Sequence, residues 1–185
     1  RNIDLEIDTI KFKINLKKFS LFLETQNPKI SYRNLSFPIK NIKLHINFLS
    51  LLKSDPKIEK TNIFLEELDI KQINRLSTII KPSNLKSLIN NKIKEGRLIS
   101  EFEIFFTKQG DVKNFITRGE VKALKAELLN DLNLSQVNFT FFADKDDILI
   151  KNVFGNLEDI KISDGDIKLN LEKGIKINSN FNTKF

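Results

Sequence analysis

The chain has 185 residues, which is enough for one domain that buries a sizeable core without disulfides or metals. Its 31 Lys and Arg outnumber its 24 Asp and Glu, and the net charge of +7 favours anionic partners such as nucleic acid, lipid headgroups or lipopolysaccharide. The absence of Cys excludes disulfides and thiolate metal sites, and no stretch approaches the roughly 18 apolar residues that cross a bilayer.

Alternation of apolar and polar residues with period two dominates the first part of the chain and predicts strands with one apolar face. In residues 10–16 and 42–48 the apolar side chains occupy even positions, and Lys, Asn or His stands between them. Residues 3–7 carry their apolar side chains at odd positions, so the phase changes by one residue. This slip predicts a β-bulge or a strand break near Asp8 and Thr9.

The middle of the chain has helical periodicity instead. A short helical turn is expected at 48–53. Apolar residues at helical spacing predict a helix over 72–80, which Pro82 ends, and Ser83 can cap a second helix that reaches Ile93. Because these helices interrupt the strands and do not alternate with them, a parallel α/β fold is not predicted.

Short turns separate the strands of the C-terminal half. Residues 98–106 alternate again, and Gln109–Asp111, Ala143–Asp147 and Ser163–Gly165 have turn composition. Connections of so few residues cannot hold a helical crossover, so consecutive strands are expected to be antiparallel. The sequence therefore predicts a mainly β fold with an antiparallel sheet, interrupted by two short helices around 72–93.

No residue pattern points to a catalytic or metal site. His45 is the only histidine, and it lies on the polar face of its strand without a carboxylate at a fixed short spacing. The acidic cluster Asp144–Asp147 has Leu149 and Gly155 where a calcium-binding loop needs Gly and Glu, so it predicts a hairpin turn. Two Ser-x-x-Lys matches lack the further elements of penicillin-recognising enzymes. We expect no enzymatic activity, no cofactor and no metal.

The aromatic residues bear on nucleic-acid binding. A stacking platform for single strands presents aromatic rings and basic groups on one face. Here 16 Phe accompany one Tyr and no Trp. Phe12, Phe48 and Phe102 occupy the apolar positions of their strands, away from the Lys residues. This pattern favours a core or an apolar groove, and nucleic acid is not an expected partner.

One stretch, residues 43–70, has a distinctive order of elements. A strand leads into Ser-Leu-Leu at 50–52, a small loop follows, and the next strand opens with an Ile a few residues on. This order resembles the AsmA-like family, to which Glu95–Ile104 and the hairpins after it are also similar. The chain begins with Arg1 and contains no Met, which predicts that residues 1–185 are a single β-rich segment of a longer protein, and the resemblance implies that this protein is AsmA-like.

The resemblance implies an antiparallel sheet curled into a β-groove with an apolar inner face and a polar outer face. It implies a periplasmic protein held in the bacterial inner membrane by an N-terminal anchor that this segment lacks. The implied partner is phospholipid or another acyl-chain lipid, carried between the inner and outer membranes or used in outer-membrane assembly. The residues predicted to line the groove are Ile42, Leu44, Ile46, Phe48, Phe102, Ile104, Phe106, Phe139 and Phe141.

Two other functions fit the same alternation. A structural or interaction module would bury the apolar faces in a closed core, and alternation does not separate a closed core from a groove. A basic nucleic-acid-binding domain would bring Phe and Lys together on one face, and its affinity would fall steeply with salt.

Overall fold

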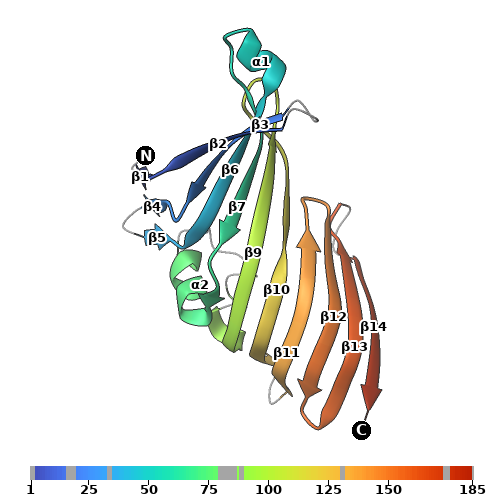
Figure 1. The fold of residues 1–185 in the computed structure, drawn as a ribbon. Helices are drawn as coiled ribbons and strands as arrows, with labels where there is room; N and C mark the ends of the chain where they lie inside the picture. The colour runs from blue at the N-terminus through green and yellow to red at the C-terminus, as the bar shows by residue number, and fades with distance from the viewer. Residues whose placement is uncertain are drawn as a thin grey trace. The chain divides into compact units, whose positions relative to one another are not determined.

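The computed structural model describes residues 3–15, 20–32, 35–78, 87, 90–129, 132–172 and 176–184 of the chain. The strands form a three-stranded sheet and an 11-stranded sheet of antiparallel neighbours, which confirms the predicted mainly β fold (Figure 1). The chain divides into two compact units. Unit 1 holds residues 1–66 and 101–117, and unit 2 holds residues 67–100 and 118–185. That these residues come from a longer protein stays a prediction.

Strand order follows the predicted meander in the C-terminal half. The 11-stranded sheet has the order β14-β13-β12-β11-β10-β9-β7-β6-β3-β2, and β8 pairs with β9. From β9 to β14 each strand pairs with the next strand of the chain, so the expected hairpins are confirmed. The strands of this sheet are β2 (Ile10–Asn15), β3 (Ser20–Gln26), β6 (Ile39–Asn47), β7 (Ile58–Leu65), β8 (Leu68–Asp69), β9 (Ile93–Phe106), β10 (Val112–Leu129), β11 (Leu132–Ala143), β12 (Asp147–Leu157), β13 (Ile160–Asn170) and β14 (Lys176–Lys184).

The three-stranded sheet belongs to unit 1. Its strands, in the order β1-β4-β5, are β1 (Ile3–Glu6), β4 (Lys29–Tyr32) and β5 (Leu35–Phe37). β1 and β2 pair in different sheets, and residues 7–9 between them are in no strand. The strand break predicted near Asp8 and Thr9 is therefore confirmed.

Cross-strand register sorts the side chains of unit 1 onto two faces. One row of directly opposed residues consists of Phe12, Leu23, Leu44, Thr61 and Ile104. The neighbouring row consists of Lys13, Phe22, His45, Lys60 and Phe105. Because successive residues of a strand point to opposite faces, this part of the sheet has one apolar face and one face on which charged and aromatic residues are mixed.

Two helices interrupt the strands close to where the sequence predicts them. α1 (Phe48–Leu52) follows β6 directly. α2 (Ile70–Ser77) begins two residues earlier than predicted because of a reciprocal cap at its first turn. The Asp69 carboxylate accepts the Gln72 N–H at 2.8 Å, and the Gln72 side chain accepts the Asp69 N–H at 2.9 Å.

The second predicted helix requires a correction at its C-terminal end. Residues 90–92 are helical, but β9 begins at Ile93, which the sequence places in the helix. This part of β9 is held by its neighbour β10, where the Lys125 ammonium binds the Glu95 carboxylate at 2.9 Å. Ser83 and most of the helix predicted after it lie outside the described residues.

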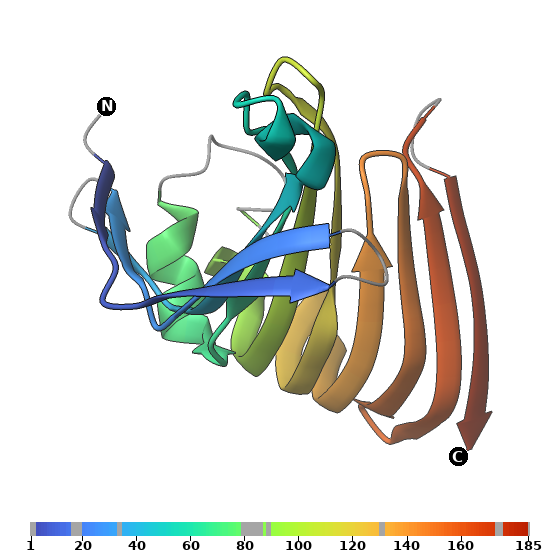
Figure 2. The ribbon, with the colours of Figure 1, turned by 45° about the horizontal axis from the view of Figure 1, so that its top comes forward.

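Aligned β-bulges interrupt the strands of unit 2. Ala123 in β10, Gln136 in β11 and Asn152 in β12 have φ angles of 50°, 52° and 55°. In β13 the pairing with β14 shifts between Ile162 and Asp164. Each bulge adds one residue to its strand. Apolar residues at even positions before the bulge and at odd positions after it, or the reverse, therefore lie on the same face of the sheet. β11, β12 and β13 lie side by side and bend along their length (Figures 1 and 2).

Polar side chains satisfy the backbone groups that the bulges free. The Asn138 side chain accepts the Ala123 N–H at 3.0 Å and donates to the Gln136 carbonyl at 2.7 Å. At the third bulge the Asp166 carboxylate accepts the Asn152 N–H at 3.4 Å, and the Asn152 side chain donates to the Thr140 hydroxyl at 3.2 Å. These contacts join β10 to β11 and β11 to β12 at the bulges.

The turn predicted at Ser163–Gly165 is wrong. These residues lie inside β13, and the chain turns instead at Glu158 and Asp159. Gly165 is directly opposite Phe181 of β14, whose ring occupies the space that a side chain on Gly165 would need. The Ser-Asp-Gly composition therefore belongs to a bulged strand covered by an aromatic ring, not to a turn.

Candidate functional site

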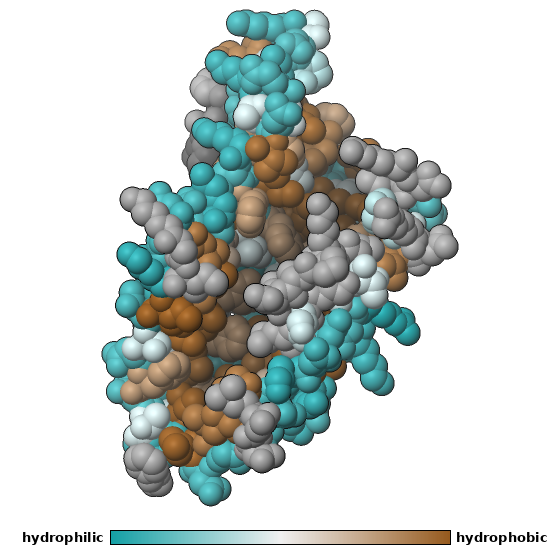
Figure 3. Space-filling model, turned by 180° about the vertical axis from the view of Figure 1, so that it is seen from behind, coloured by the Kyte–Doolittle hydropathy of each residue, from teal (hydrophilic) through white to brown (hydrophobic). Residues whose placement is uncertain are grey.

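An apolar groove of about 440 Å³ lies on one face of unit 2. Buried Val137, Val153 and Ile162 form the core beneath it, with exposed fractions of 3%, 6% and 8%. Figure 3, which shows the molecule from behind, has apolar side chains gathered over the C-terminal strands at the lower left. The lining residues, none of them charged, are Leu124, Leu128, Leu134, Val137, Phe139, Ile150, Val153, Leu157, Ile160, Ile162, Ile167, Phe181 and Thr183.

The groove is open to solvent along part of its lining. Leu128 is 42% exposed and Phe181 is 39% exposed. When an apolar ligand covers apolar side chains that are exposed to this extent, the free energy of the system falls. No charge or hydrogen-bonding pattern in the lining would select a polar ligand, so the groove is suited to a hydrocarbon chain.

The bulges create this groove by bringing residues of different sequence parity onto one face. Ile150 and Val153 both line it although they are three residues apart, because Asn152 is the extra residue between them. Gly155 permits the close approach of β11, since a Cβ there would lie 2.7 Å from the Cα of Val137. The geometry of the groove thus depends on backbone irregularities in neighbouring strands.

A second apolar cavity, of about 270 Å³, lies in unit 1 between its two sheets. Leu5 and Ile30 of the three-stranded sheet and Ile7 lie on one side of it. Ile42 and Leu44 lie on the other side, in β6. The small sheet therefore covers part of the apolar face that the larger sheet presents in unit 1.

The nine residues predicted to line a groove divide between the units. Ile42 and Leu44 line the cavity of unit 1, and Phe139 lines the groove of unit 2. Ile42 and Phe102 both pair with Ile63, and Leu44 and Ile104 both pair with Thr61, so these four residues share one face.

The remaining four predicted residues do not line either of these two cavities. Ile46 pairs with Leu21 on the apolar face of unit 1, and Phe48 begins α1. Phe106 lines a shallow pocket beside α1. Phe141 lies against Gly119 in unit 2, where a Cβ on the glycine would be 3.0 Å from its ring. Their role in binding lipid stays a prediction.

The opposite face of unit 1 carries a network of ion pairs around Glu24. The Glu24 carboxylate is 2.5 Å from the Lys13 ammonium and 3.4 Å from the Lys43 ammonium, and it accepts a hydrogen bond from Asn41 at 2.9 Å. Lys13 is the main cause of a lowered pKa of Glu24, which falls from 4.5 to about 2. Neighbouring side chains cover this carboxylate, whose side chain is only 7% exposed.

Replacing Glu24 by Gln is expected to destabilise unit 1 in a pH-dependent way. Because the pKa of Glu24 is lower in the folded than in the unfolded chain, its contribution is complete above pH 4.5 and is lost as the pH falls toward about 2. We expect Glu24→Gln to lower the free energy of unfolding by about 1–3 kcal/mol at neutral pH, since Lys13 is half exposed and screened. Urea unfolding at several pH values measures this difference.

Glu6→Gln is the matched control, because Glu6 pairs with Lys29 at 3.2 Å with both side chains largely exposed. This exposed pair is expected to contribute little at any pH. A Glu24→Gln effect that equals that of Glu6→Gln, or that stays constant down to the lowest pH, would contradict the assigned role of Glu24.

The same face brings Phe and Lys together, which the sequence reasoning missed. The ammonium groups of Lys13, Lys43 and Lys60 lie 5.8, 5.4 and 5.8 Å from the ring centroids of Phe22, Phe64 and Phe105, respectively. All three Lys also form ion pairs with carboxylates, Lys13 and Lys43 with Glu24 and Lys60 with Glu103. These cations are therefore engaged within the unit.

His45 lies within this face, between Phe22 and Lys60 on the neighbouring strands. Its ring lies against that of Phe22, with 5.5 Å between the centroids and an interplanar angle of 31°. Burial, followed by the positive charge of Lys60, lowers its pKa, so the imidazole is neutral at neutral pH. Over the described ranges, no three acidic or histidine side chains are grouped so that they could hold a metal ion.

No family model, curated protein or solved structure matches this chain. In the part of the chain that the structure describes, no helix is long and apolar enough to span a bilayer.

Proposed function

We propose that the chain is a segment of a hydrophobic groove that binds the acyl chains of phospholipid and carries lipid in a bacterial envelope. The observation that supports this proposal most strongly is the uncharged groove of about 440 Å³ in unit 2. Leu128 and Phe181 in its lining are about half exposed, and covering them with hydrocarbon lowers the free energy of the complex.

Binding of this kind needs no catalyst. Each CH2 group of an acyl chain that leaves water contributes roughly 0.8 kcal/mol, so a chain of moderate length binds without a specific polar contact. The lipid headgroup stays in water. Because the lining offers no polar group that fixes one position, a bound chain can slide along it.

The cellular setting of the proposal rests on the resemblance of residues 43–70 to the AsmA-like family. We propose a periplasmic location, attachment to the inner membrane through an N-terminal anchor outside this segment, and transport of phospholipid between the two membranes. Outer-membrane assembly is the second process in which such a groove would serve.

Displacement of a fluorescent fatty acid tests the proposal. The chain has no Trp and one Tyr, so its own emission does not interfere with that of the probe. We expect the probe to brighten on binding and to be displaced by phosphatidylcholine but not by glycerophosphocholine, which has the same headgroup and no acyl chains. Equal displacement by both compounds, or no binding of the probe, would contradict acyl-chain binding.

The convergence of Lys13, Lys43 and Lys60 with Phe rings favours a second candidate, binding of single-stranded nucleic acid. That candidate predicts an affinity for oligonucleotides that falls steeply as salt rises. The lipid groove remains our proposal because these ammonium groups already bind carboxylates of the same unit.

A further inference from the structure

Helix α1 exposes its leucines to an unusual degree. Leu49 and Leu52 are 67% and 68% exposed, Leu51 is 40% exposed, and no residue of the helix is buried. The helix projects beyond the ends of β6 and β7, between which it stands in the chain (Figure 1). A helix of five residues is not stable by itself, so something other than an apolar core holds it.

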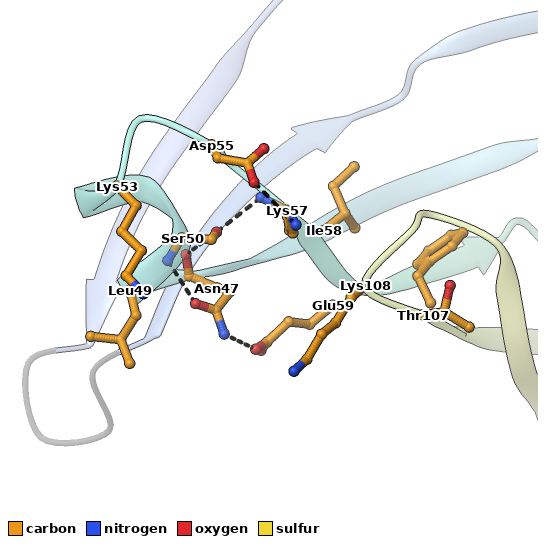
Figure 4. A pocket seen from close by; sticks show the side chains of 11 residues that line it. Asn47, Leu49, Ser50, Lys53, Asp55, Lys57, Ile58, Glu59, Thr107 and Lys108 are labelled. Atoms are coloured by element: carbon orange, nitrogen blue, oxygen red, sulfur yellow. Dashed lines mark hydrogen bonds and ion pairs between the residues drawn. The ribbon is translucent and has the colours of Figure 1, made fainter.

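Polar contacts hold the helix in place. The Asn47 side chain accepts the Ser50 N–H at 2.8 Å and donates to the Glu59 carboxylate. The Ser50 hydroxyl donates to the Asn47 carbonyl at 2.7 Å and accepts the Lys57 N–H at 2.9 Å (Figure 4). The loop after the helix is thereby tied to its first turn. These hydrogen bonds fix the position of the helix, although its leucine side chains remain exposed to solvent.

Basic side chains flank the leucines. Lys53 extends beside Leu49, and Lys108 reaches the same pocket from the turn after β9 (Figure 4). Among the described residues neither Lys53 nor Lys108 forms an ion pair, whereas Lys57 pairs with Asp55 at 3.0 Å. Two cations next to exposed apolar side chains are therefore available to an anionic partner.

We propose that this leucine tip, defined as Leu49, Leu51, Leu52, Lys53 and Lys108, inserts into the interface of an anionic phospholipid bilayer. The leucines would enter the acyl boundary while the two ammonium groups reach phosphates at headgroup level. A folded protein partner is a poorer match, because a five-residue helix offers far less than the roughly 800 Å2 that each side of a stable interface buries. The inference does not depend on the groove, since insertion needs only the tip.

A Trp introduced at the tip tests insertion directly. The chain contains no Trp, so Leu49→Trp gives a single reporter. We expect its emission to shift to the blue, and to be quenched by brominated acyl chains, when vesicles of phosphatidylcholine and phosphatidylglycerol are added. Phe154→Trp is the matched control, because Phe154 is 50% exposed but lies in β12 of unit 2, next to Val153 in the chain and therefore on the face opposite the groove. An unshifted Leu49→Trp emission, or equal shifts for both variants, would overturn the proposal.

Co-sedimentation with the same vesicles measures the contribution of each part of the tip. Leu49→Ser combined with Leu52→Ser is expected to lower vesicle affinity by about a hundredfold, since each leucine side chain contributes about tenfold. Phe154→Ser should leave the affinity unchanged. Lys53→Gln with Lys108→Gln should weaken binding to the anionic vesicles and leave binding to pure phosphatidylcholine unchanged.

Unchanged sedimentation of the double-leucine variant would overturn the insertion. Because α1 has no buried residue, these variants are expected to keep the unfolding midpoint of the parent. The two proposals, acyl-chain binding by the groove and vesicle binding by the leucine tip, can be tested separately. Leu128→Asp is expected to lose binding of the fluorescent fatty acid but to keep its affinity for vesicles. The double-leucine variant is expected to keep binding of the fatty acid and to lose affinity for vesicles.

Discussion

Asp at position 128 is expected to lower the affinity of the chain for acyl-chain ligands by at least about a hundredfold. Leu128 lines the groove of unit 2 and is 42% exposed, so the carboxylate stays hydrated in the empty protein. A bound acyl chain would strip water from that carboxylate, which costs several kcal/mol without a compensating partner. Titration of the fluorescent fatty acid measures the loss, and thermal unfolding verifies that the variant folds.

Phe154→Asp is the control for the Leu128 variant. Phe154 is 50% exposed, and its neighbour Val153 lines the groove, so alternation places Phe154 on the opposite face of β12. The same charge there should leave the affinity for the fatty acid within about twofold of the parent. If Leu128→Asp and Phe154→Asp bind alike, the groove of unit 2 is not the binding site.

Val at position 155 is expected to destabilise unit 2 by about 3 kcal/mol or more. A Cβ on Gly155 would lie 2.7 Å from the Cα and 3.0 Å from the N of Val137, and backbone atoms cannot move aside as a flexible side chain can. The φ of Gly155 is +154°, a conformation that side chains rarely adopt. Chemical denaturation of Gly155→Val against the parent measures the difference.

Gly165→Ala is the comparison that separates backbone contact from side-chain contact. A Cβ on Gly165 would meet the ring of Phe181, which is 39% exposed on β14 at the end of the strand order. Because this ring can rotate toward solvent, the expected loss is about 1 kcal/mol. A Gly155→Val variant as stable as Gly165→Ala would show that β11 and β12 do not approach each other as closely as described.

Alternation was sufficient to predict two strand segments of unit 1, because each of these segments keeps one parity. Residues 10–15 and 42–47 keep their apolar side chains at even positions, and the register brings both segments onto one face. The change of phase before Ile10 also predicted the strand break near Asp8 and Thr9 correctly, although it did not show that the chain changes sheet there. Here local sequence and tertiary structure agree.

The groove of unit 2 was mostly missed because its strands change parity in their middle. In β12 the residues that line the groove are Ile150, which is at an even position, and then Val153 and Leu157, which are at odd positions. The same argument that located the break near Asp8 would have indicated a bulge at Asn152, since Asn tolerates a positive φ. Alternation alone, however, does not show that the bulges of neighbouring strands are aligned, because that depends on register.

The contacts of the charged residues could not be predicted either. Glu24 is 11 residues from Lys13 and 19 from Lys43 in the chain, and only the antiparallel register brings the three together. Phe105 falls on the wrong parity for an apolar strand position, and the structure explains this by its contact with Lys60. An aromatic residue out of phase therefore marked the face where cations gather.

Native mass spectrometry of the purified chain, with identification of any lipid that it carries, tests the central claim most directly. We predict a species that retains phospholipid or fatty acid, that is lost in Leu128→Asp and that persists in Phe154→Asp. A lipid-free monomer, or lipid retained equally by both variants, would contradict an acyl-chain groove and favour a structural module with a closed core.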